Sequence, residues 1–122
     1  MEINNPVIQL CIAGTQAEFQ NQIPTAKKFY KQAWKIHTND YEACIAAHYM
    51  ARHQKDPKVE FIWNKKALGY SSTCQDEQVS AFLPSLNLNM GKSFEKLGDH
   101  EAAQHCYSKA SQLGLTHQME LE

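Results

Sequence analysis

The chain has 122 residues, of which 43% are hydrophobic and 20% are charged, and its formal net charge is −1. This length fits one domain over residues 1–122, large enough to bury about two-thirds of the surface of the unfolded chain, and the hydrophobic fraction excludes a disordered chain. No apolar run approaches the ~18 residues of a membrane-spanning helix, so no membrane partner is expected. The near-neutral charge also removes the simplest argument for a nucleic-acid binder.

The pattern of residues predicts an all-α protein. Glycine and proline are scarce, and apolar residues recur three and four positions apart, which is the period of a helix. Six helices are predicted, over residues 6–20, 24–37, 40–54, 57–70, 76–97 and 99–113. Asp56 before Pro57 is typical of a helix start, and Gly98 before Asp99 of a helix end followed by a new cap. Since the connections are short, successive helices are expected to lie antiparallel.

The helix pairs also repeat, most clearly in PSLNLNMGKSFEKLGDHEAAQHCYSKASQLGL, which begins at Pro84. The positions that define this unit are Met90, Gly91, Phe94, Ala103, Tyr107 and Ala110. They resemble the tetratricopeptide signature W-x2-L-G-x2-Y, then A-x3-F, then a small residue, with Asn87 in place of the Trp and Leu115 in place of the closing Pro. The small residues would let two helices approach closely, while the aromatic side chains would fill the space between pairs.

Two further copies place the repeats at about 7–40, 41–74 and 76–115. In the first copy the matching positions are Ala13, Gly14, Ala26, Tyr30 and Ala33. The middle copy diverges, because Ala47 and His48 take the Leu-Gly positions and Ala51 the first aromatic one, while Trp63 and Asn64 straddle the second. The last copy carries about nine extra residues, most simply a longer first helix kinked near Pro84.

The resemblance implies a right-handed α-α superhelix of about three tetratricopeptide-like hairpins, acting as a non-catalytic module that binds a protein or peptide. In that family the first helices line a groove for an extended peptide or a helix. The groove positions would be Ile8, Cys11, Thr15, Glu18, Phe19, Glu42, Ile45, Tyr49, Arg52, His53, Ser85, Leu88, Asn89, Lys92, Glu95 and Lys96. The positions of the co-chaperone carboxylate clamp read Cys11, Thr15, Ala46, Ser85 and Asn89. Only Asn89 fits that clamp, so it is not expected.

His48 carries an alternative interpretation. A large His48 and a small Ala51 can be a volume-conserving exchange within the core. They can also indicate a polar pocket formed by His48, Arg52, Trp63 and Asn64 that takes a small ligand or a metal ion. The groove positions and this pocket together give one predicted binding set: Ile45, His48, Tyr49, Arg52, His53, Trp63, Asn64, Leu88, Asn89 and Lys92.

Catalysis, a cofactor and a resident metal are not expected. The chain lacks a phosphate-binding glycine loop, G-x-S-x-G and H-E-x-x-H, and its histidines and cysteines do not show the spacing of a zinc site. The four cysteines are widely spaced, and the first residues lack the basic region of a signal peptide, which together predict free thiols and a cytoplasmic location.

Charge is unevenly distributed along the chain. Residues 19–66 contain nine Lys and Arg against four Asp and Glu. Basic residues interleaved with aromatic ones could contact RNA, but solvated lysines explain the pattern more simply, so nucleic acid is not an expected partner. The segment after Ala110 is too short for a full capping helix, so a second copy of the chain, giving a homodimer, is expected to cover the C-terminal end or the groove.

Overall fold

The fold is all-α in a computed structural model that describes residues 4–121, with side chains as far as residue 114. In chain order the elements are α1 (Pro6–Phe19), α2 (Ile23–Ile36), α3 (Asp40–Met50), α4 (Pro57–Thr73), the 3-10 segment η1 (Glu77–Phe82), α5 (Leu83–Lys96) and α6 (His100–Leu121). The described residues contain no strand. The expected all-α class and the six helices are therefore confirmed.

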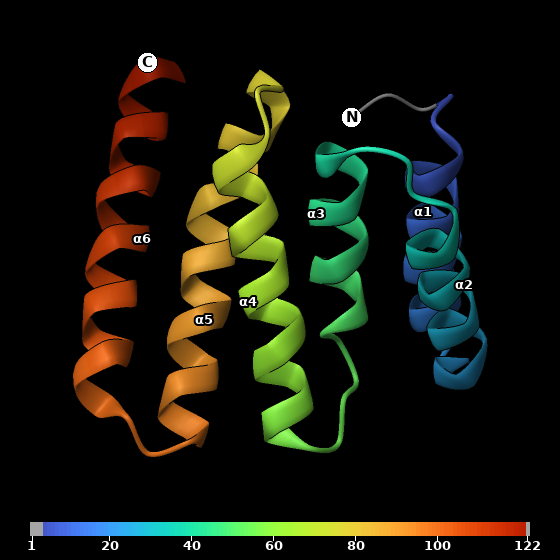
Figure 1. Ribbon diagram of the computed structural model, residues 1–122, viewed down its shortest axis with the longest axis horizontal. Coiled ribbons are helices and arrows are strands. Elements are labelled where there is room, and N and C mark those ends of the chain that lie inside the picture. The colour runs from blue at the N-terminus through green and yellow to red at the C-terminus, as the bar shows by residue number, and fades with distance from the viewer. Residues whose placement is uncertain (1–3, 122) are drawn as a thin grey trace.

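Consecutive helices run in opposite directions and pack as three hairpins, α1 with α2, α3 with α4 and α5 with α6 (Figure 1). The hairpins follow one another along the molecule, with α1 and α2 at one end and α5 and α6 at the other (Figure 1). Between hairpins, α2 packs on α3 and α4 packs on α5, and α1 also contacts α3. The middle hairpin is thus covered from both sides.

The helices begin where short polar side chains precede them. The side chains of Asn5, Asn39 and Asp56 accept hydrogen bonds from backbone N–H groups in the first turns of α1, α3 and α4, at 2.8 to 2.9 Å. Such caps satisfy donors that the helix itself leaves unpaired. The cap predicted at Asp56 is therefore present. Gly98 follows the end of α5 with φ of 86°, which is the left-handed conformation expected of a helix-ending glycine.

Two predicted helices have different limits in the structure. α3 stops at Met50 rather than continuing to residue 54, because His53 adopts a left-handed φ of 65° and the Gln54 side-chain amide donates to the Met50 carbonyl at 2.8 Å. The predicted helix over 76–97 is divided into η1 and α5. Pro84 lies in the first turn of α5, where its missing N–H leaves no helical bond to lose.

The last helix is longer than predicted, since α6 continues to Leu121 instead of ending near residue 113. Gly114 does not stop it, because glycine within a helix costs only about 1 kcal/mol relative to alanine. The expectation that this segment is too short to form a capping helix is therefore not met by the backbone of α6.

The core lies around α3, where every residue from Tyr41 to Ala47 is buried. Four of these seven residues are alanine or cysteine on the sides where α3 meets its neighbours, which brings the helices close together. Of the alanines expected at close approaches in the other helices, Ala26, Ala33, Ala67 and Ala103 are fully buried. Ala110 is only partly buried.

One predicted groove residue, Glu42, instead ties two hairpins together. Its carboxylate accepts hydrogen bonds from the Thr38 backbone N–H at 2.8 Å and from the Asn5 side-chain amide at 2.9 Å. Burial alone would raise the pKa of Glu42, but these hydrogen bonds stabilise the charged form and lower its pKa overall. Because Asn5 is also the cap of α1, Glu42 fixes the start of α1 against α3.

Candidate functional site

The middle hairpin differs from its neighbours at one pair of positions. In the first hairpin the ring of Tyr30 lies against Gly14, and in the last hairpin the ring of Tyr107 lies against Gly91 at the same spacing in the sequence. The equivalent positions in the middle hairpin are His48 on α3 and Asn64 on α4. A glycine and a large ring are thus replaced by a medium-sized ring and a short amide, and the filler of the space between the helices becomes polar.

A polar pocket of about 110 Å³ occupies this place, between α3, α4 and α5. Its lining consists of His48, Ala51, Arg52, Glu60, Asn64, Asn89, Lys92 and Lys96. All but Ala51 are polar or charged. The volume suits one small polar group, such as a carboxylate with its neighbouring carbon atoms.

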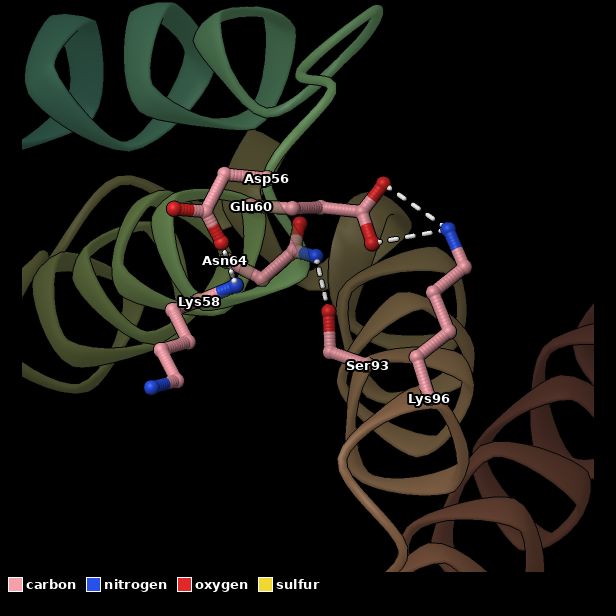
Figure 2. A network of polar contacts seen from close by, with 6 residues as sticks. All are labelled: Asp56, Lys58, Glu60, Asn64, Ser93 and Lys96. Atoms are coloured by element: carbon pink, nitrogen blue, oxygen red, sulfur yellow. Dashed lines mark hydrogen bonds and ion pairs between the residues drawn. The ribbon is translucent and has the colours of Figure 1, made fainter.

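Amide groups form the buried side of the pocket. Asn64 is 5% exposed, and its side-chain N–H donates to the Ser93 hydroxyl oxygen at 2.9 Å across the α4–α5 contact (Figure 2). Asn89 extends its side-chain nitrogen toward Nδ1 of His48, 3.5 Å away. The hydrogen bond to Ser93 uses one donor of the Asn64 amide and holds that amide in place at the wall of the pocket.

His48 is a neutral group at physiological pH. Burial lowers the pKa of its imidazole to about 4, and the positive charge of Arg52 contributes in the same direction. The edge of its ring meets the ring of Tyr49 at a centroid distance of 5.1 Å. His48 can therefore offer a hydrogen bond but no charge to a ligand.

The cations of the pocket differ in whether they already have a partner. Arg52 pairs with Glu18 of α1 at 3.0 Å, and its guanidinium also lies over the Tyr49 ring, 5.6 Å from the centroid. Lys96 holds both carboxylate oxygens of Glu60, at 2.9 and 3.1 Å (Figure 2).

Lys92 is the exception. Within the part of the chain that the structure describes, it makes no ion pair. The pocket consequently carries one uncompensated positive charge, which favours an anion of a single negative charge.

Five of the predicted binding residues meet in this pocket: His48, Arg52, Asn64, Asn89 and Lys92. The other five lie elsewhere. Ile45 is 1% exposed and belongs to the core, and Tyr49 stacks on Tyr30 with centroids 5.1 Å apart. His53 pairs with Glu18. Trp63 turns away from the pocket and meets Trp34 edge to face, with centroids 5.0 Å apart.

Leu88 lies one helical turn before Lys92 on α5, and it is 41% exposed. It lines an apolar groove of about 450 Å³ between α5 and α6, together with Pro84, Ser85, Tyr107, Ala110 and Ser111. Since residues four apart share one face of a helix, an apolar surface and a free cation are presented side by side.

Sequence reasoning missed two contributors, Glu60 and Ser93. Glu60 neutralises Lys96, and Ser93 orients Asn64. The sequence does indicate Asn64 itself. It follows His48 at the spacing that separates Tyr30 from Gly14 and Tyr107 from Gly91. No pattern within α4 or α5 could have indicated the two pairings, because each joins residues of different helices.

Among the residues that the structure describes, no three histidine, cysteine, aspartate or glutamate side chains come together as metal ligands. All four cysteines are free thiols. None of the described helices combines the length and apolar character needed to cross a bilayer.

Comparisons with protein-family models, with curated protein sequences and with solved structures found no significant match to this chain.

Proposed function

We propose that this protein is a non-catalytic peptide-binding module of the tetratricopeptide-repeat type, and that it anchors a carboxylate of its partner at the pocket between α3, α4 and α5. The repeat assignment is supported by the two equivalent glycine–tyrosine contacts, Gly14 with Tyr30 and Gly91 with Tyr107. Both pairs occur at the positions where the sequence resembles the family.

The unpaired charge of Lys92 carries the proposal for the ligand. A carboxylate at the pocket would accept a charge-assisted hydrogen bond from Lys92 and would be within the field of Arg52 and Lys96. Neutral His48 and the amide of Asn89 would add hydrogen bonds without adding charge. One carboxylate neutralises the site, whereas a second would meet the carboxylates of Glu18 and Glu60.

The neighbouring surface adds an apolar requirement. Leu88 and Lys92 are separated by one turn of α5, about 6 Å along the helix axis. Side chains two positions apart in an extended peptide project about 6.6 Å apart on one face. The preferred partner is therefore an extended peptide in which one residue separates an acidic residue from a large apolar residue.

The test is a calorimetric titration with a capped peptide that has one glutamate two positions from a leucine. Binding should weaken about tenfold when the glutamate is replaced by glutamine, and by a similar factor in the Lys92→Gln variant. The matched control is Lys109→Gln, which removes an exposed lysine of α6 that lines neither the pocket nor the apolar groove. Equal affinity for both peptides, or equal effects of the two lysine variants, would refute the proposal.

A second candidate is a small carboxylic acid as the natural ligand, as in the alternative interpretation of His48, Arg52 and Asn64. The volume of about 110 Å³ favours it, because the pocket holds a small acid without a peptide backbone. Acetate or propionate, each with a single carboxylate, should then compete for the site with an affinity similar to that of the peptide. Competition only at a hundredfold higher concentration would favour the peptide.

The proposal includes a cytoplasmic location and self-association. Free thiols at all four cysteines support a reducing compartment. The apolar groove at Leu88 and Tyr107 supports contact with a second copy at the α6 end of the array, a contact that competes with the peptide for Leu88. Light scattering during size-exclusion chromatography tests this point, with a dimer expected for the native chain and a monomer for Leu88→Lys.

A further inference from the structure

We infer that the protein has a second binding site, between α2 and α4 and adjoining the first at Arg52, for an acidic peptide segment that carries one large apolar side chain. The site is a cavity of about 410 Å³ beside the loop that connects α3 to α4. Its lining consists of Lys27, Lys28, Tyr30, Lys31, Met50, Arg52, Gln54, Val59 and Trp63. No acidic side chain lines it.

Charge identifies the ligand as an anion. Lys27, Lys28 and Lys31 are exposed on α2, and none of them makes an ion pair within the described part of the chain. Arg52 also borders the cavity, but Glu18 already neutralises it. Three uncompensated cations at the rim of one cavity favour a ligand with several negative charges.

The interior of the cavity is apolar. Met50, Val59 and Trp63 form its walls, and each is partly exposed and therefore available for contact. The volume accommodates a side chain of the size of leucine or phenylalanine together with part of its backbone. A ligand that is only charged would leave this surface uncovered, so an apolar group between charged groups fits better.

The spacing of the cations favours a peptide over a compact anion. Lys27 and Lys31 are one turn apart on α2, about 6 Å along the axis. Carboxylates at alternate positions of an extended peptide are about 6.6 Å apart. A single phosphate or sulfate would engage this row of charges at one point and would leave the apolar walls of the cavity uncovered.

The aromatic side chains argue against RNA at this site. Single-stranded nucleic acid needs exposed ring faces on which bases stack. Here Lys66 places its ammonium group over Trp63, 4.9 Å from the ring centroid, and over Trp34 at 5.4 Å. Tyr30 is only 1% exposed. The rings therefore serve as apolar walls rather than as stacking platforms.

The experiment uses the protein's own fluorescence, because Trp63 lines the cavity and Trp34, the other of the two tryptophans, meets the Trp63 ring edge to face. The probe is a capped pentapeptide with leucine between two pairs of glutamates. Its addition should change the tryptophan emission in a saturable way. Replacing the leucine by glycine should weaken binding at least fivefold, because the apolar cavity then stays empty.

The variant Lys27→Gln/Lys28→Gln/Lys31→Gln should weaken binding of the pentapeptide about tenfold. The matched control, Lys35→Gln/Lys65→Gln/Lys109→Gln, removes the same charge from exposed lysines that do not line the cavity, and its affinity should stay within about twofold of the native value. Lys92→Gln should also leave this fluorescence response unchanged, which separates the second site from the one proposed above.

Three results would overturn the inference. The first is no saturable change in emission with the pentapeptide. The second is an equal loss of affinity in the two triple variants, which would indicate attraction by net charge alone. The third is tighter binding of a short oligouridylate than of the pentapeptide through the same three lysines, which would make the site one for nucleic acid.

Discussion

The ring of Tyr30 packs directly on the backbone of Gly14, so closely that a Cβ atom on Gly14 would lie 2.2 Å from Cε1 of the ring. Gly91 and Tyr107 repeat this relationship in the last hairpin, where the corresponding separation is 2.5 Å. In both hairpins the absence of a side chain on one helix lets the tyrosine of the other fill the interface. The packing rule is thus the same at the two ends of the molecule.

Gly14→Ala should destabilise the protein by about 1–3 kcal/mol, because Tyr30 is buried and cannot swing into solvent to admit the new methyl group. Denaturation by urea, followed by circular dichroism, measures the change in the free energy of unfolding. Gly69→Ala is the control, since Gly69 is exposed on α4 with open space around it. That substitution should stabilise the protein by about 0.5–1 kcal/mol through helix propensity alone. Similar stabilities for the two variants would contradict the packing argument.

The middle hairpin can be tested by restoring the arrangement of its neighbours. Asn64→Tyr alone should cost about 1–3 kcal/mol, because the ring would enter space that His48 occupies. Adding His48→Gly should recover part of that loss, even though glycine within α3 is itself unfavourable. The double variant should also lose carboxylate binding, since the tyrosine fills the pocket.

A double-mutant cycle over the native chain, the two single variants and the double variant gives the coupling between His48 and Asn64. The expected coupling energy is at least about 1 kcal/mol in favour of the double variant. Strictly additive effects would show that the two positions do not replace the glycine and tyrosine of the other hairpins.

The all-α class and the positions of the helices along the chain could be predicted, because both depend on the spacing of apolar residues within single segments. The ends of α3 and α6 could not, since α3 ends where the side chain of Gln54 returns to the Met50 carbonyl. The pocket was partly predictable, because the repeat register places His48 and Asn64 at equivalent positions. Trp63 is adjacent to Asn64 in the sequence, but successive residues on a helix point about 100° apart. That rotation carries Trp63 to Trp34 on the other side of α4.

The sequence could not predict which cations of the pocket are neutralised by an ion pair. Whether Arg52, Lys92 and Lys96 are free or neutralised depends on Glu18 and Glu60, which approach them from other helices. Only the assembled structure shows that Lys92 alone among the three lacks an ion pair within the described residues. The specific expectation of a single carboxylate follows from that comparison.

The stability of the protein should depend on pH through His48. Burial, reinforced by the charge of Arg52, lowers the pKa of His48 to about 4 in the folded protein, against about 6.5 in the unfolded chain. Between these values the unfolded chain binds a proton that the folded chain does not. The free energy of unfolding should therefore fall as the pH drops from about 6.5 to 4, by up to about 3 kcal/mol.

The variant His48→Gln isolates this contribution. Urea denaturation at several pH values should give a shallower slope for the variant than for the native protein between pH 6.5 and 4. Glu42 acts in a lower range, because its pKa is lowered from 4.5 and its contribution is lost only as the pH falls below that value. Identical slopes for the two proteins above pH 5 would contradict the assignment of a buried, neutral His48.

The four thiols should differ sharply in reactivity. Burial raises the pKa values of Cys11 and Cys44 to about 12, so almost none of their thiolate is present at pH 8, and it also raises the pKa of Cys106. Cys74 is only partly buried, at the end of α4. With Ellman's reagent, one thiol per chain should react quickly in the folded protein, and Cys74→Ser should abolish that phase. The other three should react only at the rate at which the protein unfolds, and therefore faster as urea is added. Two or more fast thiols in the native chain would mean that α1, α3 or α6 opens far more readily than its packing implies.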